Sequence, residues 1–262
     1  MGLVVRDFTV DAYESLVSAM RAHFQLLTLE QFVADGQPMG VAVFRHDVDR
    51  DTPAAVRCAE LMARYGQRGT FYLRYPYTFV PRIIRHVASL GHEIGYHYET
   101  LAKSKGDIPK AIELFRRELA DFRTIAPVRT VCMHGSPLSP WDNRAIWKST
   151  SLAEYDLLAE PYFSVDFSQV LYLTDTGRRW DGSRFAVRDR VKTSPASPFS
   201  RTKQITEAAA RGELPERVLF TLHPERWSAS WTSWLGQLVT QNAKNVAKRV
   251  LISRRERKAH DA

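Results

Sequence analysis

The sequence predicts a single-domain α/β protein built on a parallel sheet. Short apolar runs rich in β-branched and aromatic residues alternate with helix-like stretches of about 10 to 20 residues, an order typical of parallel sheets. The runs are apolar throughout instead of alternating, which indicates strands that helices cover. With 262 residues, 44% of them hydrophobic, the chain is long enough to bury a sizeable core.

Six apolar runs are the expected strands, and a helical leader is expected before them at residues 8–32. The strands are predicted at residues 41–46, 69–74, 92–97, 129–134, about 163–173 and 218–223. Helix signals separate them. A threonine and Pro53 start a helix that ends at Gly66, and the next helix ends at Gly91. Residues 105–125 are long and amphipathic, and a serine with Pro140 repeats the helix start.

The basic residues gather near the C-terminus. The chain carries a formal charge of +8, but seven of its basic residues lie between positions 244 and 258, against one acid. Most of the excess charge therefore belongs to the tail and not to the body. We divide the chain into a helical leader at 1–40, a β/α barrel domain at 41–227, and a basic amphipathic helix with a tail at 228–262.

Cysteine usage and hydropathy suggest the compartment. The two cysteines, Cys58 and Cys132, form no Cys-x-x-Cys pair, so neither a disulfide framework nor a cysteine zinc cluster is expected. The first residues resemble no secretory signal, and no run of about 20 apolar residues occurs. We expect a cytoplasmic protein.

Polar residues end four of the predicted strands. His46, Asp47 and Asp49 end the first, and His97, His134 and His223 end the third, the fourth and the last in that order. In a β/α barrel the C-terminal ends of the strands meet at one mouth, where active sites are built. A single histidine at a strand end is usually structural, whereas this set together predicts a functional site.

Imidazole and carboxylate groups are the usual ligands of a catalytic Zn²⁺ or similar ion. Such an ion acidifies its water and polarises a carbonyl oxygen. A further carboxylate can accept the proton of the water, and a histidine can return a proton to the leaving group. The residues at the strand ends therefore predict metal-assisted hydrolysis of an amide or ester.

The segment HEIGYH differs from the His-Glu-x-x-His motif of zinc peptidases. His92 and His97 are five residues apart, and the segment is a predicted strand. An odd spacing on a strand places two side chains on opposite faces. We expect His97 to face the site and His92 to be structural.

At these residues the chain resembles the polysaccharide deacetylases, also called NodB-like proteins or carbohydrate esterase family 4. The resemblance covers roughly residues 40–227 and consists of HDVD after an apolar strand, GHEIGYH after a helix, a strand-end motif near 134, and LFTLHPERW near the C-terminus. It implies a distorted (β/α)7 barrel and a divalent metal, Zn²⁺ as the first choice. It also implies removal of an acyl group, here an N-acetyl group, from a sugar.

The resemblance also implies roles for single residues. Asp47 matches the catalytic base and Asp49 a metal ligand, although the two roles can be exchanged, and His97 matches a second ligand. His223 matches the general acid, and Asp175 is expected to orient a catalytic histidine.

One position departs from the family pattern. The second metal-binding histidine of the family's motif is replaced by Leu101, so we expect His134 to supply the third ligand. The alternative for His134 is contact with the substrate or with the base, and Glu99 is a weaker substitute ligand. His46 is expected to be supporting, because a regular strand points it away from Asp47.

Three residues are expected to contact the sugar. Trp180 is predicted to form a wall of the sugar pocket, Arg178 to meet a phosphate, and Tyr98 to contact the substrate. The alternative for the segment 171–180 is a plain turn with a buried tryptophan.

The C-terminal segment from residue 231 has apolar residues at helical spacing, followed by the basic tail. One interpretation is a last helix packed on the barrel with a solvated end. The other is peripheral contact with an anionic membrane at the inner face. No nucleic-acid motif accompanies the charge, so no nucleic-acid partner is expected.

Two functions remain open from the sequence. The first is a metal-dependent sugar deacetylase that acts on a nucleotide- or lipid-linked, phosphate-containing intermediate of surface polysaccharide synthesis. The second is an inactive barrel of the same type that binds carbohydrate or serves as a peripheral assembly factor.

Overall fold

A computed structural model describes residues 6–135, 139–180, 191 and 198–241 of the chain. The strands are β1 (Gln25–Leu27), β2 (Val41–Val48), β3 (Thr70–Leu73), β4 (Glu93–Tyr98), β5 (Val131–Met133), β6 (Leu171–Thr174) and β7 (Arg217–Leu222). The α-helices that lie wholly within the described residues are α1 (Val10–His23), α2 (Leu29–Ala34), α3 (Thr52–Arg64), α4 (Pro81–Ser89), α5 (Thr100–Lys103), α6 (Ile108–Arg123), α7 (Pro161–Ser164) and α8 (Thr202–Ala210), and residues 231–241 are helical as well. Within the described residues, 3-10 helices occupy Asn143–Lys148, Ala153–Tyr155 and Pro224–Arg226.

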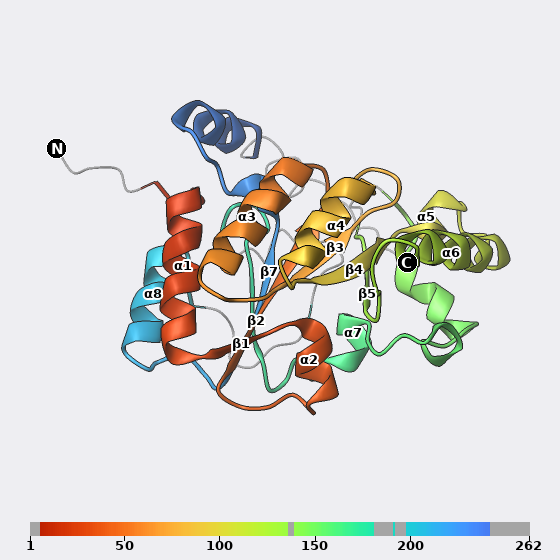
Figure 1. Ribbon diagram of the computed structural model, residues 1–262, viewed down its shortest axis with the longest axis horizontal. Helices are drawn as coiled ribbons and strands as arrows, with labels where there is room; N and C mark the ends of the chain where they lie inside the picture. Colours follow the sequence, from red (N-terminus) through yellow and green to blue (C-terminus); the bar gives the residue numbers. More distant parts are fainter. Residues whose placement is uncertain (1–5, 136–138, 181–190, 192–197, 242–262) are drawn as a thin grey trace, which may run out of the picture.

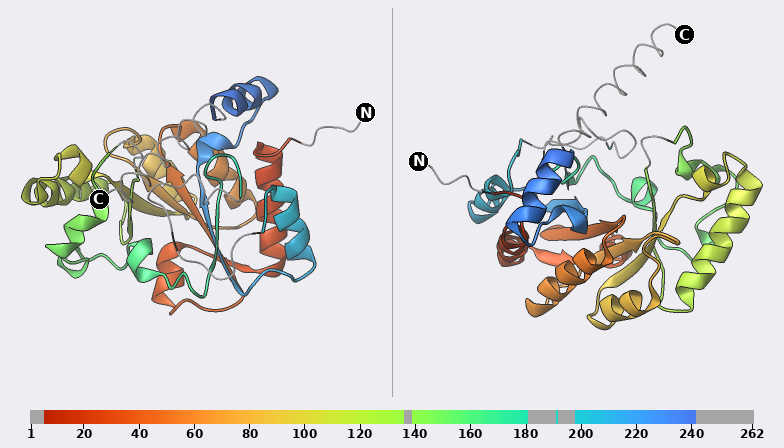
Figure 2. Two further views of the ribbon diagram at one scale, coloured as in Figure 1. Left: turned by 180° about the vertical axis from the view of Figure 1, so that it is seen from behind. Right: turned by 90° about the horizontal axis from the view of Figure 1, so that it is seen from above.

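The strands form one parallel sheet of seven strands. The strand order is β5-β4-β3-β2-β7-β6. The remaining strand, β1, pairs with the first half of β2, and β3 pairs with the second half of β2. Seen from above, the sheet curls (Figure 2). Among the described strands, β5 and β6 are the two ends of this strand order and do not pair with each other, so the curl stays open between them. The predicted α/β class with a parallel sheet in a single domain is confirmed.

Side chains of both faces of the sheet are buried, as the continuous apolar strands predicted. The outer face, which includes Phe44, Phe71 and Tyr96, packs against α1, α3, α4 and α6 in one large cluster (Figure 1). The inner face of the curl carries Val43 and Tyr72 in a second, smaller cluster. Because strand side chains alternate, each position near a strand end belongs to one of these faces.

Several boundaries differ from the sequence predictions. The leader at 8–32 is not one helix, because β1 separates α1 from α2. The run at 163–173 is a strand only in its last part, and its first residues belong to α7. The cap of α3 is Asp51, whose carboxylate accepts a hydrogen bond from the amide of Ala54.

No helix within the described ranges is both long and apolar enough to cross a membrane.

Candidate active site

Asp47 lies on the inner face of the sheet near the end of β2, where Arg45 on the same face donates two hydrogen bonds to its carboxylate. The guanidinium donates from Nε to Oδ1 at 2.8 Å and from Nη2 to Oδ2 at 2.6 Å, and both side chains are almost completely buried. Burial alone would raise the pKa of Asp47, but the charges of Arg45 and His97 and the hydrogen bonds from Arg45 together outweigh it and lower the pKa well below its usual range. Asp47 is therefore an ionised, oriented acceptor. Sequence reasoning missed Arg45, although its spacing of two residues from Asp47 on a strand was a signal.

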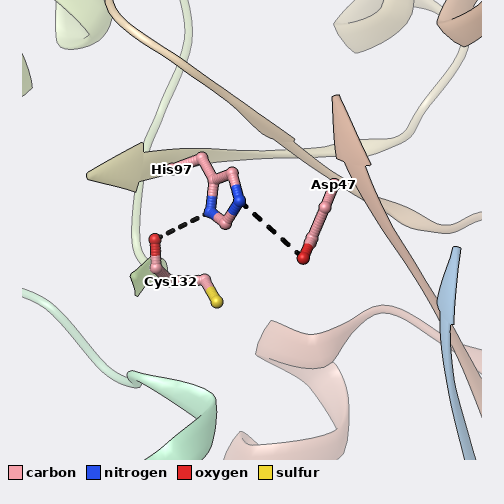
Figure 3. Close-up of side chains that lie close together, drawn as sticks. All are labelled: Asp47, His97 and Cys132. Atoms are coloured by element: carbon pink, nitrogen blue, oxygen red, sulfur yellow. Dashed lines mark hydrogen bonds and ion pairs between the residues drawn. The ribbon is translucent and has the colours of Figure 1, made fainter. Parts of the chain in front are cut away.

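His97 lies on the inner face of β4, with one ring nitrogen committed to the backbone. Its Nδ1 donates to the carbonyl oxygen of Cys132 at 2.9 Å, which leaves a lone pair on Nε2 (Figure 3). This Nε2 lies 3.8 Å from Oδ2 of Asp47 and 3.7 Å from Oδ1 of Asp49. Burial lowers the pKa of His97 to about 4, so the ring is neutral at pH 7. A neutral ring with a fixed tautomer is what a metal ligand requires.

Asp49 lies between two imidazoles. Its Oδ1 lies 3.5 Å from Nε2 of His134, in addition to the 3.7 Å to Nε2 of His97. Within the described residues this oxygen is buried and accepts no hydrogen bond. Donor atoms on a tetrahedral zinc ion lie about 3.3 Å apart. An unpartnered carboxylate oxygen with two imidazole nitrogens near that separation fits a divalent cation, so the chemistry of Asp49, His97 and His134 suits the predicted ligand set.

A second layer orients His134. Glu99 accepts from Nδ1 of His134 at 3.0 Å and from Nη2 of Arg74 at 2.9 and 2.8 Å. Burial raises the pKa of Glu99, but the hydrogen bond from His134 and the charge of Arg74 outweigh it and lower the pKa to about 2. Glu99, expected as a weaker substitute ligand, instead accepts a hydrogen bond from His134, the residue predicted to supply the third ligand. Arg74 was not found from the sequence.

Cys132 offers an alternative ligand set. One ligand atom from each of Asp47, His97 and Cys132 lies within 4.8 Å of the others, and all three residues are buried. However, both oxygens of Asp47 accept hydrogen bonds from Arg45, and Nδ1 of His97 donates to the Cys132 carbonyl. We therefore favour the set with Asp49, in which His97 contributes its uncommitted nitrogen.

His223 and Asp175 lie side by side at the ends of β7 and β6. Asp175 accepts from Nδ1 of His223 at 2.7 Å and from its backbone amide at 2.8 Å. Arg226 and Trp227 also donate to this carboxylate, at 2.6 and 3.1 Å. Burial and the charge of Arg226 lower the pKa of His223, but the charge and hydrogen bond of Asp175 together with the charge of Asp49 leave it raised above its usual value. The structure thus brings together the expected pair.

The two halves of the site influence each other electrostatically. Burial raises the pKa of Asp49, but the charges of His134, His223 and His97 lower it, and Asp49 in turn raises the pKa of His223. Glu225 belongs to the same neighbourhood, because its pKa is raised by burial and, against the effect of His223, by Asp49. Its Oε2 is buried and has no hydrogen-bond partner among the described residues. The sequence analysis did not single out Glu225.

The structure does not place the three expected sugar-contacting residues at this site. Tyr98 points to the outer face, because it is next to His97 on the strand and neighbouring strand residues face opposite sides. There it is completely buried, and its hydroxyl accepts a hydrogen bond from Trp147. Trp180 is 2% exposed and donates to Thr202, as in the alternative of a buried tryptophan. Arg178 is 8% exposed, and it donates to the carbonyl oxygen of Trp234 and to Gln237.

Two further histidines are structural. His46 is completely buried, stacks on Phe71 with a centroid distance of 4.2 Å, and is bonded to the hydroxyl of Tyr13. Burial lowers its pKa to about 3. His92 accepts from the amide of Gly69 and donates to the carbonyl oxygen of Ala59, so it joins α3 to the sheet.

Comparisons with known proteins yield solved structures only. No family model matches the chain, and neither does any curated protein. Similar structures include a CE4 esterase from Streptococcus mutans at 14% identity, which covers 90% of each chain with a TM-score of 0.41. A cobalt complex of a family 4 acetyl xylan esterase from Clostridium thermocellum matches at 15% identity, over 79% of this chain and 84% of that one, with a TM-score of 0.36.

A CE4 family pseudoenzyme from Bacillus anthracis is similar as well, at 13% identity over 79% of this chain, with a TM-score of 0.39. The chain spans only 60% of the length of that protein. All three similar proteins are described as members of CE4 or family 4, the carbohydrate esterase family whose motifs the sequence resembles. Because the identities and TM-scores are low, the activity of this chain has to be judged from its own residues.

Proposed function

We propose that this protein is a metal-dependent hydrolase that removes an acyl group, in the first instance N-acetyl, from a sugar. The observation that carries the proposal is the division of the site into two prepared halves. One half presents to two imidazoles a buried oxygen of Asp49 that has no hydrogen-bond partner among the described residues, and the other half holds His223 on Asp175. A protein that only binds carbohydrate needs neither half.

Each residue has a task in this reaction. A divalent cation held by Asp49, His97 and His134, with Zn²⁺ as the first choice, would supply a Lewis acid for the acyl carbonyl. Asp47 accepts a proton from the attacking water, and its ion pair with Arg45 keeps the carboxylate ionised and oriented. His223 returns a proton to the leaving amine, and Asp175 fixes its tautomer. The Arg45 contact favours Asp47 as the base and leaves Asp49 as the ligand.

Metal analysis followed by an activity assay tests the proposal. The purified protein, supplied with Zn²⁺ or Co²⁺, is expected to retain about one ion per chain and to release acetate from N-acetylated sugars. Asp47→Asn should keep the ion and lose about 10²- to 10⁴-fold in kcat, whereas Asp49→Asn should lose the ion. A protein that holds no ion after this treatment, or that holds one and cleaves no acylated sugar, would support the inactive carbohydrate-binding barrel instead.

We also propose that the C-terminal segment contacts an anionic membrane at the cytoplasmic face. Residues 231–241 are helical, and Trp231, Leu235 and Val239 project from this helix at a spacing of four residues. They are 54%, 46% and 63% exposed, which forms an apolar stripe on a helix whose sequence continues into the basic tail. Tryptophan and aliphatic side chains combined with lysine and arginine are typical of helices at membrane surfaces.

Liposome co-sedimentation tests the membrane contact. The full chain is expected to sediment with vesicles that contain anionic lipid, less so at high salt, and not with neutral vesicles. The double variant Trp231→Ser, Leu235→Ser and a truncation after Val239 should both reduce the bound fraction. Undiminished binding of the truncated chain would contradict the proposal and favour a helix that merely packs on the domain.

A further inference from the structure

An open pocket of about 400 Å³ lies directly beside the candidate active site. Its lining includes Tyr77 from the loop after β3, Lys103 at the end of α5, Lys105 from the turn that follows α5, and Trp141 from the loop after β5. Glu99 also lines it, and the carboxylate of Glu99 accepts the hydrogen bond from Nδ1 of His134. A molecule in this pocket therefore lies one residue away from a proposed metal ligand.

Two aromatic rings at this pocket are exposed to solvent. The exposed fraction is 63% for Tyr77 and 41% for Trp141, which is unusual for rings of this size. The indole of Trp141 lies against Gly106, where an added Cβ would come within 2.5 Å of it, so the ring rests on the backbone. The guanidinium of Arg74 lies 4.6 Å from the centroid of the Tyr77 ring. Supported and exposed aromatic faces at a pocket suit the C–H faces of a sugar ring.

Among the charged side chains that line the pocket, one lysine has no ion-pair partner in the described part of the chain. Glu99 is paired with Arg74, and Lys103 is paired with Glu118, from which its Nζ lies 3.0 Å. Lys105 is exposed and forms no ion pair with any residue in the described part of the chain. Since the other charges at the pocket compensate one another, Lys105 supplies an uncompensated positive charge beside the two rings.

We infer that this pocket binds the unit of the substrate next to the acylated sugar, and that this unit carries an anionic group, a phosphate or a carboxylate. The inference rests on the proposed function, because it is Glu99 that places the pocket beside the reacting sugar. The rings of Tyr77 and Trp141 hold the sugar face, and Lys105 binds the anion. The substrate is therefore an acidic saccharide or a sugar phosphate and not a neutral chain.

Direct binding to the full-length protein tests this inference without any catalytic readout. Titration calorimetry measures the affinity for N-acetylglucosamine, N-acetylglucosamine 1-phosphate and N-acetylglucosaminuronic acid, with inorganic phosphate alone as a fourth probe. At least one of the two anionic sugars is expected to bind on the order of tenfold more tightly than the neutral sugar, and the difference should shrink with added salt. The anionic probe that shows the gain identifies phosphate or carboxylate as the group bound.

Two variants separate charge from stacking. Lys105→Gln should abolish the preference for the anionic sugar, whereas Lys110→Gln, at a lysine that is 75% exposed on α6, serves as the matched control. Tyr77→Ser should weaken binding of all three sugars and leave inorganic phosphate unaffected. Equal affinity for the neutral and the two anionic sugars, or an anion preference that survives Lys105→Gln, would overturn the inference.

The proposed function is tested separately. If the protein binds the anionic sugar through Lys105 but releases no acetate, the pocket stands and the hydrolase proposal fails. If it deacetylates neutral and anionic sugars alike with no contribution from Lys105, the hydrolase stands and the pocket assignment fails.

Discussion

Replacement of Asp175 by asparagine tests whether the orientation of His223 matters for activity, while the proposed metal ligands are left unchanged. Asp175 is completely buried and accepts hydrogen bonds from His223, Arg226 and Trp227, and it is bonded twice to His223. An asparagine keeps the shape but replaces one acceptor oxygen with an NH₂ group that faces donors. The imidazole then loses its fixed tautomer.

The size of the effect follows from these contacts. A hydrogen bond to a charged group contributes roughly 1.5–3 kcal/mol, which corresponds to a loss of about 10- to 160-fold in kcat. The charge of Arg226 also loses its buried partner, and we expect the free energy of unfolding to fall by about 3 kcal/mol.

The pH dependence supplies the sharpest readout. If His223 is the acid of the proposed reaction, activity is expected to fall as the pH rises through its pKa, to whose raised value Asp175 contributes. Without the carboxylate, this alkaline limb should move to lower pH. The same pair stabilises the fold at low pH, and that contribution is lost as the pH rises through the raised pKa.

The assay is acetate release from an N-acetylated sugar by the metal-loaded protein across the pH range, with circular dichroism as the check on folding. Asp166→Asn, at an exposed aspartate, is the matched control, and His223→Gln should lose both most of the activity and the alkaline limb itself. A folded Asp175→Asn protein with full kcat and an unmoved alkaline limb would refute the role of His223 as the acid.

Three further predictions concern the rest of the site and its support. Cys132→Ala should leave the metal content and the Co²⁺ absorption spectrum unchanged, because in the favoured ligand set Cys132 contributes only its backbone carbonyl oxygen, which orients His97. If the variant lost a thiolate charge-transfer band, the alternative ligand set with Cys132 would be favoured. Glu99→Gln should weaken metal affinity by about 10- to 100-fold, measured by competition with a chelator, since His134 loses its orienting carboxylate; an unchanged affinity would remove His134 from the ligand set. Gly95→Ala should lower the free energy of unfolding in urea by about 1–3 kcal/mol, because the new Cβ would lie 2.3 Å from the ring of Tyr72, whereas Gly236→Ala, with nothing within 4 Å, should not lower it.

Much of the site was predictable because parallel strands all end at one edge of the sheet. His97, His134 and His223 each follow or end an apolar run, so their strand-end positions were visible in the sequence. The pairing of Asp175 with His223 came from the family resemblance, and the structure places both residues at the ends of neighbouring strands.

Other residues were misplaced for reasons of parity and packing. Tyr98 is next to His97 in the chain, but alternation along a strand turns it to the outer face. Trp180 follows a turn whose direction is not encoded locally, and the turn carries the ring into the core beside Phe8 and Trp227.

The sequence by itself determined the α/β class, the approximate strands and the polar residues at their ends, because these depend on local periodicity and on residue type. Only the tertiary structure decided which groups orient those residues by hydrogen bonds: Arg45 orients Asp47, the carbonyl oxygen of Cys132 orients His97, and Glu99 orients His134. The contacts to His97 and His134 join different strands or loops, and they depend on the strand order and the curl of the sheet. These are set by packing of the whole chain, which no short segment specifies.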